Sequence, residues 1–174
     1  MRPKTLYGRS KLEAEQALVE LENENFSICI LRPANVYGKG CRGSYISKFK
    51  SITKKLPAIP YAFKKTKQGL IYIENLCELV RLVVENRASG VFAVQDKNSV
   101  STVEIISAIS NAMGVKRKNS KLLGLIVKIF RFGPVKKLYG GIAYHEEYAK
   151  TELGDYCKVA FVEAMLKTCE NKVE

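Results

Sequence analysis

The sequence is poor in the residues on which several common kinds of site depend. Its 174 residues include no tryptophan and one histidine, His145, whose neighbours Tyr144 and Glu146 are typical of a surface position. The cysteines are scattered, odd in number and without a Cys-x-x-Cys pair, so neither a disulfide framework nor a zinc site is predicted. We therefore expect reduced thiols and no metal site.

Long hydrophobic runs and acidic residues are also scarce. No apolar run is long enough to span a bilayer, and no signal peptide is visible, so we expect a cytoplasmic protein. Seventeen Asp and Glu against 29 Lys and Arg leave a net charge of +12. Such a charge favours anionic partners, which include nucleic acid, a phosphorylated small molecule and acidic lipid.

Strand and helix patterns alternate along the chain, which predicts the α/β class. Short apolar runs predict strands at 26–31, 70–73 and 91–94, the first buried on both faces as in a parallel sheet. Amphipathic spacing and capping residues predict helices at about 5–24, 44–55, 75–84, 101–114, 122–130 and 159–168.

The first predicted helix carries an unusual stripe. At helical spacing one face collects Tyr7, Lys11, Ala14, Leu18 and Leu21. A stripe that faces the core should be apolar, yet this one begins with a phenol and an ammonium group. We interpret the pair as part of an active site, the alternative being an exposed helix end. An ammonium group one turn away stabilises phenolate, the form in which tyrosine acts as a base.

A glycine-rich loop follows the first predicted strand. Residues 38–43 match the pattern G-x-G-x-x-G between a strand and a helix. The pattern does not predict a dinucleotide site, because its first glycine comes several residues after the strand and no acidic residue lies about 20 positions later. The loop is either a substrate-side loop or a flexible connection.

Two basic stretches and one apolar stretch could bind a partner. The lysines of 48–55 and 64–67 have no interleaved aromatic platform, so they are typical of a solvated face and nucleic acid binding is not expected. Residues 121–137 combine apolar side chains with basic flanks. This composition is typical of a buried helix, but it also allows peripheral contact with a membrane surface.

Five short motifs in one order resemble the C-terminal half of an extended short-chain dehydrogenase/reductase, in the NAD-dependent sugar-nucleotide epimerase/dehydratase family. The similarity is carried by Tyr7-Gly8-Arg9-Ser10-Lys11, Leu31-Arg32-Pro33-Ala34-Asn35-Val36-Tyr37-Gly38, Leu70-Ile71-Tyr72-Ile73-Glu74-Asn75-Leu76, Ser101-Thr102-Val103-Glu104 and Leu153-Gly154.

This resemblance implies roles for individual residues. Tyr7 would be the catalytic base that takes a proton from the sugar hydroxyl, and Lys11 would bind the nicotinamide ribose and favour the ionised phenol. Pro33 and Ala34 would lie against the nicotinamide end of NAD, and Asn35 would contact the sugar nucleotide. A further substrate position is Gln68, where many relatives carry an arginine that binds the diphosphate; Lys64, Lys65 and Lys67 are its substitutes.

The resemblance also implies an architecture. We expect the C-terminal half of a Rossmann-like parallel sheet with flanking helices, within residues 1–100, and a small, mostly helical substrate-binding part, within 101–174. The N-terminal half of the family, with its phosphate loop and upstream Ser or Thr, has no counterpart here. We therefore expect a fragment or truncated product that holds NAD weakly and turns over little by itself.

The function that follows is that of a fragment of a UDP-glucose 4-epimerase-like isomerase or dehydratase of surface polysaccharide biosynthesis. Its expected partner is a nucleotide-diphosphate sugar, with a lipid-linked sugar as a variant. Unpaired sheet edges allow a homodimer. The alternatives are an inactive module that binds a sugar nucleotide or a protein, and a basic binder of nucleic acid or of a membrane surface.

Overall fold

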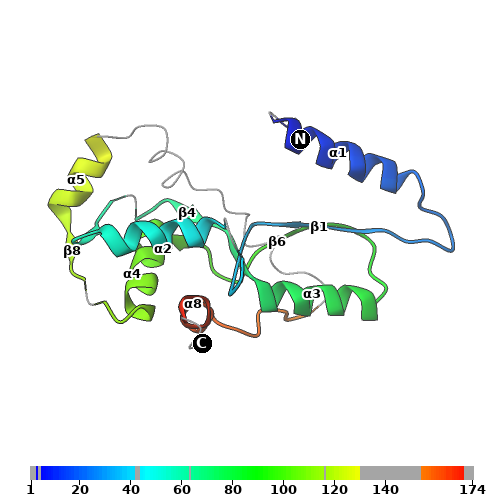
Figure 1. Ribbon diagram of the computed structural model, residues 1–174. Helices are drawn as coiled ribbons and strands as arrows, with labels where there is room; N and C mark the ends of the chain where they lie inside the picture. Colours follow the sequence, from blue (N-terminus) through cyan, green and yellow to red (C-terminus); the bar gives the residue numbers. More distant parts are fainter. Residues whose placement is uncertain are drawn as a thin grey trace.

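The protein was analysed as a computed structural model, which describes residues 3, 5–41, 44–62, 64–115, 117–129 and 154–170. His145, Leu153 and the second half of the 121–137 stretch lie outside the described residues. Helices and parallel strands alternate along the described chain, which confirms the predicted α/β class (Figure 1).

The elements follow one another in a simple order. They are α1 (Leu6–Val19), β1 (Cys29–Pro33), β2 (Asn35–Tyr37), α2 (Tyr45–Lys55), β3 (Ile59–Pro60), β4 (Lys67–Gln68), β5 (Leu70–Tyr72), α3 (Ile73–Glu85), β6 (Gly90–Val94), β7 (Val100–Ser101), α4 (Thr102–Ala112), β8 (Asn119–Ser120), α5 (Lys121–Ile129) and α8 (Phe161–Cys169).

The strands pair across long stretches of sequence. Strand β1 runs parallel to β6, with Cys29 opposite Gly90 and Pro33 opposite Val94. Strands β2 and β5 are also parallel, as are β3 and β8, whereas β4 and β7 are antiparallel. The connections between the parallel partners contain helices, as parallel pairing requires. The predicted parallel arrangement is therefore confirmed.

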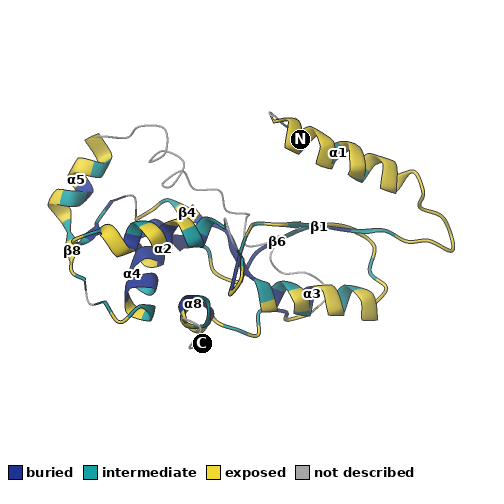
Figure 2. Cartoon of the chain, in the orientation of Figure 1, coloured by how far each residue is buried: buried dark blue, intermediate teal, exposed yellow. Residues whose placement is uncertain are grey.

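The main core lies where α2, α4 and α8 pack beside the β2–β5 pair (Figure 2). Its largest members come from all of these elements and include Tyr37, Phe49, Tyr72, Ile105 and Met165. A second cluster contains Ile71, Leu79, Val94 and Tyr156. Both clusters join residues from before and after position 100, and the division at that position stays a prediction.

Serine caps define two of the helices as the sequence predicts. The Ser44 hydroxyl accepts a hydrogen bond from the backbone N–H of Ser47 at the start of α2, 3.2 Å away. Ser101 and Glu104 form a complete capping box at the start of α4, with backbone donors at 3.3 and 2.6 Å. Each cap satisfies backbone N–H groups that have no partner within the helix.

The first two elements differ from their predicted extents. Helix α1 ends at Val19, because the backbone pairs Asn23 with Phe26 and the Asn23 side chain accepts from the backbone N–H of Asn25. Strand β1 begins at Cys29, three residues later than predicted, and Ile30 is its single buried residue. The prediction of a strand buried on both faces is wrong for the described chain, because the hollow between α1 and β1 leaves one face of the strand partly open.

A buried polar centre joins three segments of the chain. The Asp96 carboxylate accepts hydrogen bonds from the Asn75 amide at 2.8 Å, the Tyr72 backbone N–H at 3.1 Å and the Tyr37 hydroxyl at 3.4 Å. Asn75 also donates to the carbonyl of Val159 and accepts from its N–H, both at 3.0 Å. These bonds tie β5 and α3 to Asp96, two residues after the end of β6, and to the segment that enters α8.

We predict that Asn75→Ala destabilises the protein by about 2–4 kcal/mol, because both backbone groups of Val159 and one Asp96 oxygen lose a buried partner. The measurement is urea unfolding followed by circular dichroism. Asn86→Ala is the matched control, since the exposed Asn86 amide donates only to the carbonyl of Leu82 in its own helix. Equal effects of the two substitutions would contradict this structural role.

Asp96 also makes stability depend on pH. Burial raises the pKa of Asp96 to about 6, although the hydrogen bonds from Asn75, Tyr72 and Tyr37 oppose this rise. Because the pKa of Asp96 is higher in the folded protein than in the unfolded one, the folded protein binds the carboxyl proton more tightly. This proton binding stabilises the fold at low pH, and the stabilisation is lost as pH rises from about 4 through 6.

We therefore predict that the stability of the wild-type protein, relative to Asp96→Asn, falls by about 3 kcal/mol between pH 4 and pH 7. Asn carries no charge at either pH, and other titrating groups are common to both proteins. The free energies of unfolding of both proteins, measured across this range, test the prediction. A difference that does not change with pH would contradict it.

Candidate functional site

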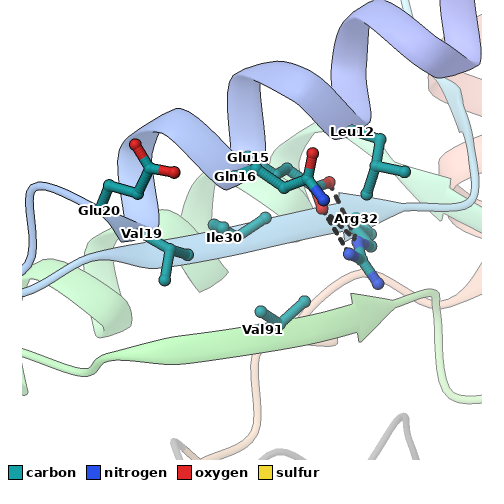
Figure 3. A pocket seen from close by; sticks show the side chains of 8 residues that line it. All are labelled: Leu12, Glu15, Gln16, Val19, Glu20, Ile30, Arg32 and Val91. Carbon is teal, nitrogen blue, oxygen red and sulfur yellow. Dashed lines mark hydrogen bonds and ion pairs between the residues drawn. The ribbon is translucent and has the colours of Figure 1, made fainter.

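The helix that carries the candidate catalytic pair lies across the first strand. Figure 3 shows α1 running over β1 in the opposite direction, with Leu12 near Arg32 and Val19 near Ile30. Between them lies an open hollow of about 560 Å³, lined by Leu12, Glu15, Gln16, Val19, Glu20, Ile30, Arg32 and Val91. The helix is therefore held above the strand with little direct packing, and it buries no residue of its own.

One ion pair fixes the helix on the strand. The Arg32 Nε group donates to both carboxylate oxygens of Glu15, at 3.0 and 3.2 Å, and its Nη2 group donates to Oε2. The hydrogen bond from Arg32 lowers the pKa of Glu15. Sequence reasoning missed this pair. The signal that could have found it is an arginine in a mostly apolar strand beside a helix rich in glutamate.

The ion pair sets where Tyr7 and Lys11 lie. They precede Glu15 by two turns and one turn, about 12 and 6 Å along the helix axis. The helix and the strand run in opposite directions (Figure 3), so Tyr7 and Lys11 lie beyond Glu15 along the helix axis, on the side toward which β1 runs. The Lys11 ammonium lies 5.6 Å from the centre of the Tyr7 ring. The two predicted catalytic groups are therefore neighbours of each other, and their place beside the end of β1 stays a prediction.

The orientation of the helix differs from the expected one. The stripe of Tyr7, Lys11 and Leu18 was expected to face the interior, but Tyr7 is 73% exposed and Lys11 and Leu18 are exposed too. The face turned to the sheet carries Leu12 and Glu15 instead, because the bond between Glu15 and Arg32 sets the rotation of the helix. The phenol and the ammonium are open to a ligand.

The strand end presents the next group of predicted residues. Pro33 and Asn35 are exposed, and Ala34 is held by its N–H, which donates to the carbonyl of Val94 at 2.8 Å. The Asn35 amide donates to the carbonyl of Gly69 at 3.4 Å. A Cβ atom on Gly69 would lie 2.4 Å from Gln95 Oε1 and 3.2 Å from Ala34 Cβ, so only glycine allows this close approach.

Gln68, the residue before Gly69, is buried beside this exposed surface. It is 2% exposed, and its Nε2 group donates to the Thr102 hydroxyl at 3.1 Å. Two of the three predicted substitutes are engaged as well: Lys67 pairs with Glu104 at 2.9 Å, and Lys64 donates to the Tyr61 hydroxyl. The hydrogen bond from Gln68 to Thr102 links β4 to α4. The contact of Gln68 with a substrate stays a prediction.

Two glycines of the 38–43 loop, Gly38 and Gly40, are described by the structure. A Cβ atom on Gly38 would lie 2.4 Å from Ile73 Cγ2, so this glycine allows the loop to pack on the start of α3. Gly40 adopts φ +83°, a left-handed turn with open space around its Cα. The rejection of the loop as a dinucleotide fingerprint stays a prediction. Among the described residues, no cluster of His, Cys, Asp and Glu could hold a metal ion, and no helix is long and apolar enough to cross a membrane.

The sequence matches the model of the NAD dependent epimerase/dehydratase family over residues 1–117. The chain belongs to this family. It is 32% identical over 114 residues to the UDP-glucose 4-epimerase of Vibrio cholerae, a match that covers 64% of this chain and 35% of that protein. The family assignment confirms the resemblance carried by the sequence motifs.

Solved structures share the fold. The UDP-N-acetylglucosamine 4-epimerase of Bacillus cereus superposes with a TM-score of 0.65 at 20% identity, covering 97% of this chain and 56% of that one. The UDP-glucose 4-epimerase of Thermus thermophilus, solved with NAD, gives a TM-score of 0.64 at 22% identity, with 97% and 54% covered. The chain thus spans about half the length of these relatives.

NAD is the cofactor of the family, and the residues of this chain fit one end of it. The exposed phenol of Tyr7 and the ammonium of Lys11 are groups that can hydrogen-bond ribose hydroxyls, and their contact with NAD stays a prediction. For the diphosphate end, the described residues of the glycine-rich loop show only that Gly38 lies close to Ile73 and that Gly40 has open space around it.

We predict that Glu15→Gln loosens α1 without loosening the core. Amide hydrogen exchange of residues 6–19 should become about tenfold faster, the equivalent of roughly 1.4 kcal/mol, because a half-buried charge-assisted bond is lost. Exchange in α4 should not change. The effect of the substitution should fade below about pH 4. Because the pKa of Glu15 is lowered in the folded protein, the ion pair stabilises the helix above the unfolded pKa, and this stabilisation is lost as pH falls.

Glu13→Gln is the matched control for this measurement, because Glu13 is an exposed glutamate on the same helix. Equal exchange rates in the two variants would show that the ion pair does not hold the helix.

Proposed function

We propose that the chain is the part of an NAD-dependent UDP-sugar 4-epimerase that carries the catalytic base. The observation that carries this proposal is the pairing of Tyr7 with Lys11, both exposed on α1, the helix that the Glu15–Arg32 ion pair joins to β1. The relatives are 4-epimerases of UDP-sugars, which supports this substrate class.

The proposed chemistry divides among few residues. Tyr7 accepts the proton of a sugar hydroxyl, and the Lys11 ammonium stabilises the phenolate that performs this step. Bound NAD supplies the hydride acceptor. Pro33 and Ala34 lie against the nicotinamide end, while the Asn35 amide, close to the Gly69 carbonyl, orients the sugar nucleotide.

The whole reaction needs groups that the relatives carry in their remaining length. We therefore propose that this chain alone binds NAD weakly and turns over slowly. Cytoplasmic location, a role in surface polysaccharide synthesis, a lipid-linked sugar and a homodimer belong to the same proposal. A dehydratase would use the same cofactor and catalytic base, and a catalytically inactive module that binds a sugar nucleotide or a protein is the second candidate.

The test joins this chain to the N-terminal part of the Vibrio cholerae UDP-glucose 4-epimerase, up to the point where the two sequences begin to match. We predict that the chimera interconverts UDP-glucose and UDP-galactose. Tyr7→Phe should reduce kcat at least a hundredfold, because the variant lacks the group that moves the proton, while the chimera still retains NAD. Tyr61→Phe, which removes a phenol whose partner is Lys64, should leave kcat unchanged.

Wild-type turnover by Tyr7→Phe in a chimera that contains NAD would overturn the proposal. A folded chimera that binds UDP-glucose in calorimetry without turning it over would favour the inactive binding module instead.

A further inference from the structure

A second surface lies at the opposite end of the molecule from α1. Helix α5 stands at the edge of the fold, and much of its outer side is exposed (Figure 1 and Figure 2). Four aliphatic side chains repeat there at positions i, i+3, i+4 and i+7 and are between 42% and 71% exposed: Leu122, Leu125, Ile126 and Ile129. This spacing places them on one stripe, which we call the α5 stripe.

The opposite face of α5 is fixed to the protein. Gly124 is buried against the backbone of Tyr61, where a Cβ atom would lie 2.5 Å from the carbonyl oxygen. The Ser120 hydroxyl accepts from the backbone N–H of Leu123 at 3.1 Å, and Tyr61 donates its own N–H to the Ser120 carbonyl at 3.1 Å. The helix therefore cannot rotate to bury the α5 stripe, because the glycine contact admits no larger side chain.

The stretch of sequence that contains this helix carries charges of one sign. From residue 105 to residue 145 the sequence contains no Asp or Glu, and it contains eight basic residues: Lys116, Arg117, Lys118, Lys121, Lys128, Arg131, Lys136 and Lys137. Lys121 and Lys128 are exposed on α5 itself, about 100° around the helix from the centre of the α5 stripe. An aliphatic stripe with ammonium groups beside it matches the boundary between acyl chains and anionic headgroups.

We propose that helix α5 docks the protein on the surface of an anionic lipid bilayer. The α5 stripe enters the boundary between headgroups and acyl chains, and Lys121 and Lys128 remain at the level of the lipid phosphates. The aliphatic character of the stripe argues against nucleic acid, whose bases stack on aromatic side chains. The inference does not depend on the proposed enzymatic function.

The experiment is sedimentation of the purified chain with lipid vesicles. Vesicles of phosphatidylcholine containing about one third phosphatidylglycerol should bind the chain, and vesicles of phosphatidylcholine alone should bind it at least tenfold more weakly. High salt should weaken the binding. The double variant Leu125→Glu with Ile129→Glu should lose at least tenfold in affinity, and Lys121→Gln with Lys128→Gln should lose about tenfold.

The matched control is Val84→Glu with Val162→Glu. These valines lie on α3 and α8 and are 69% and 67% exposed, so they add the same charge at equally exposed apolar positions outside the α5 stripe. The control should bind vesicles nearly as well as the wild type. Circular dichroism and urea unfolding confirm that each variant is folded.

Three results would overturn the proposal. The first is no binding to the anionic vesicles, and the second is an equal loss of vesicle affinity in the stripe variant and the control. The third is binding of short duplex DNA that the stripe substitutions leave unchanged, in the absence of vesicle binding. Loss confined to the stripe and lysine variants supports it.

Discussion

The ion pair between Glu15 and Arg32 is the constraint on which the candidate site depends. Helix α1 contributes no buried side chain, so apolar packing does not determine its place. The bidentate bond instead fixes both the position of the helix along β1 and its rotation. Tyr7 and Lys11 lie on the same helix at fixed offsets from Glu15. The bond between Glu15 and Arg32 therefore also sets the position of the Tyr7 hydroxyl group, two turns away.

A buried polar centre supports the part of the candidate site at Asn35, the first residue of β2. Asp96 and Asn75 are buried, and their hydrogen bonds unite β5, α3, the end of β6 and the segment before α8. Strand β5 in turn pairs with β2, which begins at Asn35. The two halves of the candidate site thus rest on different interactions. One half is held by a half-buried ion pair and the other by a buried polar centre.

The sequence predicted what local chemistry determines. The caps at Ser44 and Ser101 and the strand-to-helix junction at Tyr72 are where short-range patterns place them. The order of motifs also predicted the family. The rotation of α1 was not predictable, because an amphipathic pattern assumes that the apolar stripe is covered, whereas here a distant arginine selects the face with Glu15. The burial of Gln68 was not predictable either, because the hydroxyl that accepts its hydrogen bond belongs to Thr102, 34 positions later in the sequence.

The central claim is that Tyr7 meets the cofactor and the sugar at the end of β1. The most direct measurement is the ¹³C NMR signal of the Tyr7 ring in the NAD-containing chimera, assigned by comparison with Tyr7→Phe, before and after addition of UDP-glucose. The account predicts that the Tyr7 signal shifts on addition while that of Tyr61 does not. An unchanged Tyr7 signal under saturating UDP-glucose would contradict it.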